Sequence, residues 1–190
     1  VFRSLAAGQA DNAPRERVRA PGIVLHSMSA ALADHQLVGW KQYTTTAKGA
    51  RFLVGLYDQH SGELIALIEA DRLGQYRTGA VTGLAIRHLA AEDADQVGMF
   101  GCGWQAESQL AAAAAVRNLR RAFVYCRDPQ RRTQFAEKMR AQLHIDVVAC
   151  NDPNQAVQDQ PIVITATTSR EPVFDGTKLA DGAVVCAVGS

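Results

Sequence analysis

A glycine loop between a short apolar segment and a helix-forming segment constrains the fold of this chain most strongly. Gly101, Gly103 and Ala106 give the spacing Gly-x-Gly-x-x-Ala, after the apolar run 96–101 and at the start of the helical pattern 106–119. The first glycine allows a tight turn, the second allows a pyrophosphate to approach the backbone, and the alanine lets helix and strand pack closely. Free N–H groups at the helix N-terminus favour phosphate. The loop therefore predicts a dinucleotide-binding site.

Strand and helix patterns alternate through the rest of the second half. Apolar runs predict strands at 96–101, 122–126, 146–150, 162–167 and 183–189. Asp128 followed by Pro129 predicts a helix start, because aspartate caps free N–H groups and proline fits the first turn. Asn151 or Asp152, followed by Pro153, predicts a short helix in the same way. This alternation predicts a doubly wound parallel sheet, a Rossmann-type α/β domain.

The first half has a different, β-rich pattern. Strands are predicted at 22–28, 37–46, 51–58 and 63–70, with a hairpin turn at Ser61-Gly62. A connecting helix is predicted over 78–91, with Thr78 as its N-cap. Its expected apolar face holds Val81, Leu84, Ala85, His88 and Leu89. We therefore expect a partial β-rich domain over 1–92 and a dinucleotide-binding domain over 93–190.

Composition excludes several classes of protein. The formal net charge is +1 and 47% of the residues are hydrophobic, so a core can form and neither nucleic acid nor a membrane surface is an expected partner. The histidines and cysteines lack metal-ligand spacing, so no metal is expected. We expect the four cysteines to be small buried residues of a reduced, cytoplasmic protein. Because the chain begins at Val1 without an initiator methionine, we expect a fragment of a longer protein.

The residue after the second strand of such a domain separates the two nicotinamide dinucleotides. NAD-binding folds place an acidic residue there, whereas this strand is followed by Arg127. Arg127, with Arg131 or Arg132 nearby, is suited to a 2′-phosphate. The alternative is a solvated arginine beside the capping Asp128. NADP(H) is therefore favoured over NAD(H).

Two cations in the first half are candidates for substrate binding. Arg77 directly precedes the predicted helix, where a guanidinium and free N–H groups together form a carboxylate receptor. Lys41 lies inside an apolar, strand-like run. The alternatives are a surface arginine at a loop and an edge lysine that faces water.

Several motifs in order resemble the ornithine cyclodeaminase/mu-crystallin family. They are Glu69-Ala70-Asp71-Arg72-Leu73-Gly74, Arg77-Thr78-Gly79-Ala80, Phe100-Gly101-Cys102-Gly103-Trp104-Gln105-Ala106, Thr165-Ala166-Thr167-Thr168-Ser169, Pro172-Val173-Phe174 and Ala187-Val188-Gly189-Ser190. The resemblance covers about residues 15–190. It implies an NAD(P)-dependent amino or imino acid oxidoreductase, similar to archaeal-type alanine dehydrogenase or ketimine reductase. It also implies a homodimer formed mainly through residues before about 70.

The resemblance implies roles for particular residues. Arg77 matches an arginine that meets both the substrate carboxylate and the cofactor, and Thr78 beside it is expected at the cofactor. Lys41 matches a substrate lysine with a catalytic proton-donor role, and Arg17, or Arg15 in another register, matches a second carboxylate-binding arginine. The remaining cofactor positions implied by the resemblance are Trp104, Gln105, Thr167, Ala187, Val188 and Gly189. They join Gly101 and Gly103 of the glycine loop and Arg127 after the second strand, which the motif and the strand order indicate.

Departures from the family pattern keep three functions open. Met28-Ser29-Ala30 stands where relatives often have Met-Pro-Ala, which affects the expected substrate shape. The catalytic aspartate of ornithine cyclodeaminase follows the segment that matches Gly189, and this sequence ends at Ser190. The alternatives to a dehydrogenase or reductase are a non-catalytic NADP(H)-binding protein similar to mu-crystallin and a cyclodeaminase.

Overall fold

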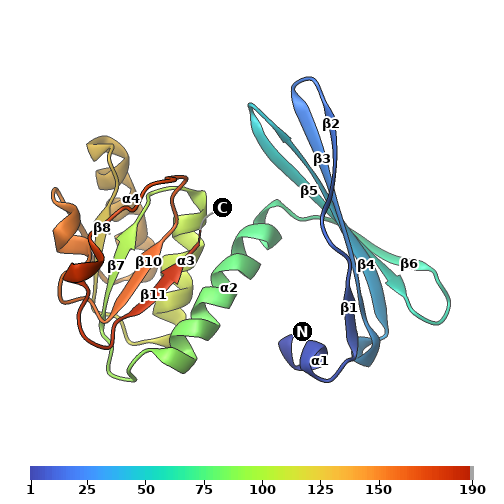
Figure 1. The fold of residues 1–190 in the computed structure, drawn as a ribbon, viewed down its shortest axis with the longest axis horizontal. Helices are drawn as coiled ribbons and strands as arrows, with labels where there is room; N and C mark the ends of the chain where they lie inside the picture. Colours follow the sequence, from blue (N-terminus) through green and yellow to red (C-terminus); the bar gives the residue numbers. More distant parts are fainter. Residues whose placement is uncertain (189–190) are drawn as a thin grey trace. The chain divides into compact units, whose positions relative to one another are not determined.

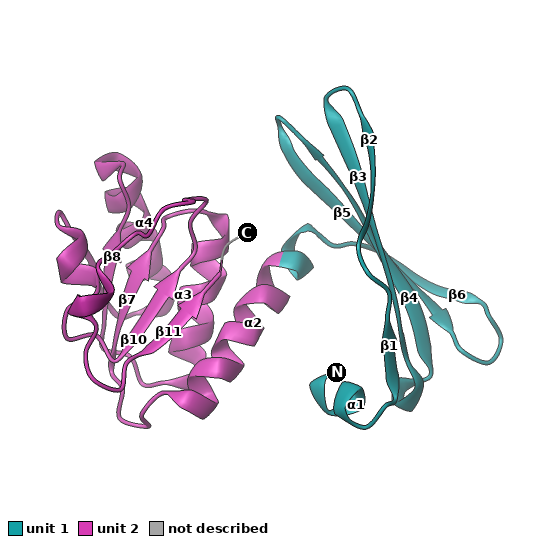
Figure 2. Ribbon diagram, in the orientation of Figure 1, with its two compact units in different colours: residues 1–74 teal, residues 75–190 magenta. Residues whose placement is uncertain are grey.

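The chain divides into two compact units (Figure 2). The computed structural model describes residues 1–188. The first unit ends at Gly74 and the second begins at Gln75, so the division lies within helix α2 (Asp71–Leu89). The sequence-based division at residues 92 and 93, which assigns the connecting helix to the first domain, stays a proposal.

Unit 1 is a six-stranded antiparallel sheet with the order β1-β3-β4-β5-β6, in which β2 pairs with the remaining part of β3 (Figure 1). Its elements are α1 (Phe2–Ala6), β1 (Ala10–Asn12), β2 (Glu16–Ala20), β3 (Ile23–Leu32), β4 (Leu37–Thr46), β5 (Gly49–Asp58) and β6 (Leu64–Glu69), with a 3₁₀ helix over Ala33–His35. The four predicted strands are present, and the turn at Ser61-Gly62 joins β5 to β6. In β2 every residue is exposed, which explains why hydrophobic alternation did not reveal it.

Unit 2 is a five-stranded parallel sheet with the order β11-β10-β7-β8-β9. Its strands are β7 (Gln96–Phe100), β8 (Arg121–Tyr125), β9 (Asp146–Ala149), β10 (Ile162–Thr165) and β11 (Val184–Ala187), and its helices after α2 are α3 (Trp104–Val116) and α4 (Pro129–Leu143), with 3₁₀ helices over Pro153–Ala156 and Gly176–Lys178. In this order β7 is central: β8 and β9 are added on one side of it, β10 and β11 on the other, so the strand order reverses between β7 and β10. A doubly wound sheet binds its ligand at such a reversal, so the prediction of a Rossmann-type domain is confirmed.

Helix α2 begins seven residues earlier than the sequence predicted. It starts at Asp71, and Asp71 Oδ1 accepts a hydrogen bond of 2.8 Å from the Phe52 N–H group. Thr78 is therefore inside the helix and not its N-cap, and Arg77 does not precede a helix start. The helix continues through Gly79, where a glycine is needed because any Cβ would overlap the Ser108 carbonyl of α3.

The apolar face predicted for α2 is also wrong. Val81, Leu84 and Leu89 are 46%, 43% and 69% exposed, and His88 is exposed as well. The buried positions of this helix are instead Gly74, Gln75, Gly79, Thr82, Gly83 and Ile86. Of the predicted face only Ala85 packs, partly buried, against the core. Small residues allow α2 to approach α3 closely, and a search for large apolar side chains does not detect such a surface.

The core of unit 2 lies on both faces of the parallel sheet. One cluster includes Met99, Leu110, Val124 and Met139, and the other is built around Phe100. Glycine at position 98 is required because a Cβ there would collide with the Ala156 carbonyl. Among the described residues, no helix combines the length and apolar character that crossing a bilayer demands.

Candidate functional site

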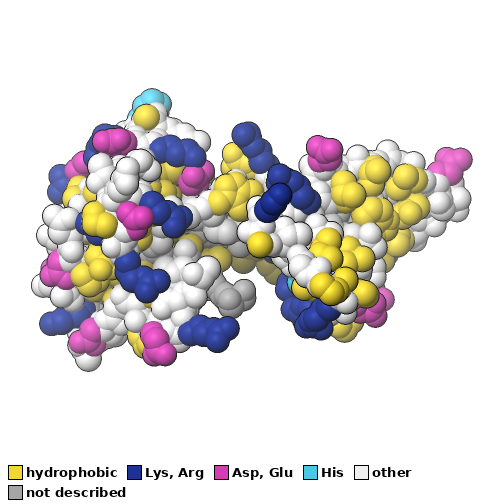
Figure 3. Space-filling view, turned by 90° about the horizontal axis from the view of Figure 1, so that it is seen from above, with side chains coloured by type: hydrophobic (Ala, Val, Ile, Leu, Met, Phe, Trp, Pro, Cys, Tyr) yellow, Lys and Arg dark blue, Asp and Glu magenta, His cyan; other side chains and the backbone are white. Residues whose placement is uncertain are grey.

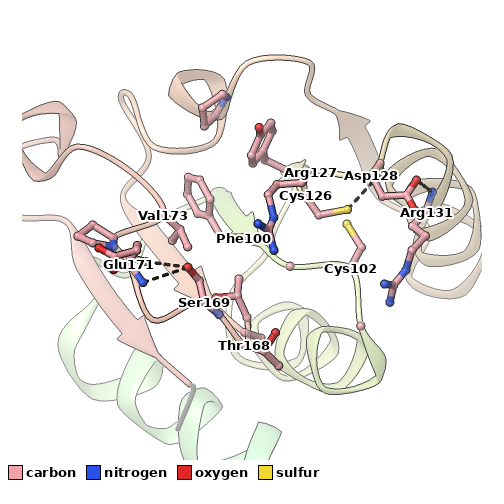
Figure 4. A pocket seen from close by; sticks show the side chains of 17 residues that line it. Phe100, Cys102, Cys126, Arg127, Asp128, Arg131, Thr168, Ser169, Glu171 and Val173 are labelled. Atoms are coloured by element: carbon pink, nitrogen blue, oxygen red, sulfur yellow. Dashed lines mark hydrogen bonds between the residues drawn. The ribbon is translucent and has the colours of Figure 1, made fainter.

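A pocket of about 650 Å³ lies at the carboxyl end of the parallel sheet (Figure 4). It is lined by the glycine loop after β7, the end of β8 and the segment after β10, which meet where the sheet order reverses. The lining residues are Phe100, Gly101, Cys102, Gly103, Tyr125, Cys126, Arg127, Asp128, Arg131, Pro153, Ala166, Thr167, Thr168, Ser169, Glu171, Pro172 and Val173. The predicted residues Gly101, Gly103, Arg127 and Thr167 thus come together here.

The glycine loop has the conformation that a phosphate-binding loop needs. Gly101 has a φ of 110° and a Cβ there would overlap the Ala166 carbonyl, so only glycine fits. Gly103 has open space where a Cβ would point, and it forms the N-cap of α3 without a side-chain cap. The first N–H groups of this 13-residue helix are therefore available to an anion. These residues fit the pyrophosphate of a dinucleotide.

Trp104 and Gln105 support the loop from the first turn of α3 and do not line the pocket. The Gln75 side-chain amide donates to the Trp104 carbonyl, and Ser108 Oγ donates to the Gln105 carbonyl at 3.0 Å. The Trp104 side chain is 45% exposed. Buried Gln105 Oε1 has no hydrogen-bond partner within the part of the chain that is described.

The end of β8 brings basic side chains to the pocket. Arg127 and Arg131 line it, together with Asp128, which caps α4 by accepting hydrogen bonds from the Gln130 and Arg131 N–H groups at 2.9 and 3.1 Å. Arg132 is buried instead: it donates to the Cys126 carbonyl at 2.9 Å and to an Asn151 side-chain oxygen at 2.7 Å. Of the two nearby arginines considered from the sequence, Arg131 is therefore the one at the pocket.

The remaining predicted cofactor residues lie elsewhere in unit 2. Ala187 ends β11, and the Val188 N–H group donates to the Thr165 carbonyl at 2.7 Å; neither residue lines the pocket. Gly189 falls outside the described residues. Arg77 is exposed on α2, and neither it nor Thr78 lines the pocket.

Lys41 lies in a smaller pocket of unit 1, of about 250 Å³, beside Met28 and Trp40. Its Nζ atom is 5.2 Å from the centre of the Tyr43 ring and 4.9 Å from that of Phe52. Cations are attracted to aromatic faces at such distances. The alternative of an edge lysine in water is therefore not what the structure has: β4 is an inner strand and the amine lies over two rings.

Arg15 and Arg17 share this neighbourhood. Arg17 of β2 is paired with His26 of β3. His26 is in turn paired with Tyr43 of β4, and the two rings stack with their centres 4.2 Å apart. The Arg15 guanidinium lies 5.9 Å from the centre of the Tyr43 ring. Both arginines considered from the sequence thus lie near His26, and Arg15 also lies near Tyr43. Lys41, two residues from Tyr43 on β4, projects from the same face.

Sequence reasoning missed His26. Its side chain is 9% exposed; Nε2 is 2.9 Å from the Thr45 hydroxyl, and buried Nδ1 has no hydrogen-bond partner within residues 1–188. Burial lowers the pKa of His26 below 6.5, and the positive charges of Arg17, Arg15 and Arg19 lower it further. The alternation of Arg15, Arg17 and Arg19 is a signal of a basic sheet face, but only pairing with β3 places His26 on it.

Lys41 and Arg17 belong to unit 1, whereas Arg77 and the glycine loop belong to unit 2. The convergence of the three cations at one carboxylate therefore stays a prediction. No group of three metal-ligating side chains occurs in residues 1–188.

Comparison with known proteins decides the family. The model of the ornithine cyclodeaminase/mu-crystallin family matches residues 1–190. The chain belongs to the ornithine cyclodeaminase/mu-crystallin family. Delta(1)-pyrroline-2-carboxylate reductase of Bacillus cereus is 35% identical over 138 residues, which are 73% of this chain and 42% of that protein.

Solved structures of relatives share the fold. Delta(1)-pyrroline-2-carboxylate reductase of Thermococcus litoralis, in complex with NADH and L-proline, matches with a TM-score of 0.91 and 30% identity over 99% of this chain and 61% of that one. A probable ornithine cyclodeaminase of Bordetella pertussis matches with a TM-score of 0.91 and 29% identity, covering 100% of this chain and 60% of that one. The chain thus spans about 60% of these solved chains and about 42% of the curated reductase.

Proposed function

We propose that this chain is part of an NAD(P)-dependent oxidoreductase that acts on a small amino or imino acid. The observation that carries the proposal is the pocket at the sheet reversal, where open space at Gly103 and uncapped N–H groups of α3 accept a pyrophosphate. The family relatives include a pyrroline-2-carboxylate reductase solved with NADH and L-proline, so a cyclic imino acid is the first substrate to test.

Gly101, Gly103 and the start of α3 hold the pyrophosphate in this proposal, and Thr167 borders the same pocket. A bound nicotinamide dinucleotide supplies or accepts the hydride, which the protein side chains do not. The protein holds the substrate carbon in position and excludes competing orientations, which accounts for much of the rate. Arg127 and Arg131 favour NADP(H), because two guanidinium groups suit a 2′-phosphate.

Arg17, Lys41 and Arg77 bind the substrate in this proposal. The arginines hold the carboxylate, and Lys41 donates a proton or hydrogen bond to the nitrogen or oxygen at the reacting carbon. The position of Lys41 over Tyr43 and Phe52 supports this role, because the rings restrain the amine and limit its contact with water.

The test is oxidation of NADPH by the purified protein with Delta(1)-pyrroline-2-carboxylate, and its reverse with L-proline. Lys41→Met should lower kcat much more than Lys48→Met, a matched change at an exposed residue in the β4–β5 turn. Tight dinucleotide binding without turnover of any amino, imino or keto acid would favour the mu-crystallin-like binding function. Release of ammonia from ornithine would favour the cyclodeaminase.

A homodimer is proposed through unit 1. Large apolar side chains are exposed there (Figure 3), namely Val18, Val38, Leu53, Leu64, Ile65 and Leu67. Such surfaces and open strand edges are normally covered by a partner, and a second copy is the partner that the family resemblance implies. A monomer in light scattering at micromolar concentration would contradict this.

We also propose a cytoplasmic location. The free cysteines support a reducing, cytoplasmic compartment.

A further inference from the structure

Cys102 and Cys126 meet inside the dinucleotide pocket. Cys102 lies between the two glycines of the loop, and Cys126 directly follows β8. Phe100 and Tyr125 are paired across β7 and β8, and the Gly101 N–H group donates to the Tyr125 carbonyl at 2.9 Å, so the chain leaves both strands side by side. Figure 4 shows the sulfur atoms of Cys102 and Cys126 facing one another, and Cys126 is close enough to contribute to the raised pKa of Cys102.

Cys102 and Cys126 are partly accessible to solvent, whereas the other two cysteines are buried. Both are half-buried and line the pocket, whereas Cys150 and Cys186 are 1% and 9% exposed in the apolar core. The sequence-based expectation of four small buried cysteines is therefore correct for Cys150 and Cys186 and wrong for this pair. The reason is that both leave the sheet at its carboxyl end, where the pocket opens.

We propose that Cys102 and Cys126 form a reversible disulfide across the dinucleotide pocket when a peroxide oxidises them, and that this disulfide weakens dinucleotide binding. The second part rests on the proposed function, and the first does not. Cys102 and Cys126 follow neighbouring parallel strands, which lie about 4.8 Å apart, and Cys102 is one residue beyond the position that continues the register opposite Cys126. Disulfides span Cα separations of about 4.4–6.8 Å, so only a small shift of the loop is needed to join the two thiols.

The chemistry has a defined order. The Cys126 thiolate attacks one oxygen of hydrogen peroxide, the O–O bond breaks, and Cys126 sulfenic acid and hydroxide form. The Cys102 sulfur then attacks the sulfenic sulfur; the S–S bond forms, the S–O bond breaks, and water leaves with the Cys102 proton. The hydroxide takes up the proton that the Cys126 thiol lost on forming the thiolate, so the two thiols lose two electrons in total and peroxide becomes two molecules of water.

The surroundings support these roles. Burial raises the pKa of Cys102, and so does its contact with Cys126, so Cys102 is the poorer first nucleophile and is assigned the role of the second, resolving thiol. Cys126 lies at the pocket wall, and its Sγ atom is 3.3 Å from the Asp128 carbonyl. A dithiol reductant reverses the reaction by thiol–disulfide exchange.

The disulfide acts on binding through the glycine loop. The glycine loop already presents its backbone N–H groups to a pyrophosphate, and a bond from Cys102 to the residue after β8 would pull the loop out of that conformation and place the two bonded sulfur atoms in the pocket. Binding and oxidation therefore oppose each other, and the linkage is reciprocal: a bound dinucleotide must also disfavour the disulfide at equilibrium. By covering the two thiols, the dinucleotide should slow disulfide formation as well.

The test compares reduced, peroxide-treated and re-reduced protein. Peptide mapping without reductant should give a Cys102–Cys126 linked peptide that is two hydrogens lighter than the separate peptides, and saturating NADP⁺ should slow its formation at least tenfold. After catalase treatment, the dissociation constant for NADPH should be at least tenfold higher than in the reduced protein, and dithiothreitol should restore it.

Variants separate the pair from the other thiols. In the Cys102→Ala and Cys126→Ala variants, peroxide should produce no linked peptide and should leave the NADPH affinity of the variant unchanged. In the Cys150→Ala variant, peroxide should still produce the linked peptide and still weaken NADPH binding. Absence of the linked peptide from peroxide-treated wild type, or unchanged NADPH affinity once it has formed, overturns the proposal. A linked peptide in a protein whose reduced form binds no dinucleotide would contradict the proposed function and the binding effect together.

Discussion

Gly79 of α2 lies directly against the Ser108 carbonyl of α3, at a separation that leaves no room for a Cβ atom. This contact joins the connecting helix to the helix that carries the glycine loop. Backbone packed against backbone leaves little freedom for adjustment, so Gly79 fixes how closely the two helices approach.

Gly79→Ala should destabilise the protein by about 1–3 kcal/mol, because the added methyl group forces the helices apart. Gly74→Ala is the matched control on the same helix, since a Cβ at Gly74 meets no other atom within 4 Å. It should leave stability unchanged or raise it by up to about 1 kcal/mol, because alanine favours the helix. Urea unfolding measures both changes, and equal effects would refute the close contact.

Arg127→Ala should weaken binding of NADPH more than binding of NADH, and Arg131→Ala should do the same. Both side chains line the pocket, and a lost contact to a charged phosphate costs about 1.5–3 kcal/mol. Arg120→Ala is the control, because Arg120 pairs with Asp95 before the start of β8, at the opposite end of the strand. Fluorescence titration of each variant gives the ratio of the two affinities. A wild-type preference for NADH would contradict the prediction.

Acidification should destabilise unit 1 through His26. Its pKa is lower in the folded state than the unfolded value of 6.5, so between these two values the unfolded chain binds more protons. Stability therefore rises with pH in this window; the full contribution is present above about pH 6.5 and declines as the pH falls toward the folded pKa. His26→Gln should flatten this dependence, whereas His60→Gln, at an exposed position, should not. The prediction is tested by measuring the free energy of unfolding of the wild type and both variants across this pH range.

Arg77→Ala should raise the substrate KM by about one to two orders of magnitude, because a charge-assisted hydrogen bond is worth about 1.5–3 kcal/mol. Arg77→Lys should recover part of the loss, since lysine lacks the two-pronged guanidinium. The carboxylate would be held by the Arg77 guanidinium without help from helix N–H groups, because Arg77 lies inside α2 and not before its first turn. Arg72→Ala, at another exposed position of this helix, should leave KM unchanged in steady-state kinetics.

The sequence alone determined the parallel domain and the centre of its pocket. Residues 96–106 contain the strand, the glycine loop and the helix start in one continuous segment, and Asp128 with Pro129 marks the next helix. Such features are local, because turn conformation, helix capping and strand alternation depend on residues that are neighbours in the chain. They can therefore be predicted from the sequence without knowledge of the tertiary structure.

Tertiary structure decided what depends on neighbours from distant segments. The start of α2 coincides with the hydrogen bond from the Phe52 N–H group of β5 to Asp71, and the buried face of α2 follows from the close approach of α3 to Gly79. The position of His26 follows from pairing of β2 with β3. Cys102 and Cys126 are 24 positions apart in the chain and meet only because β7 and β8 are neighbours. Periodicity within a segment shows which side chains share a face, but the surface that covers that face is set by packing between segments.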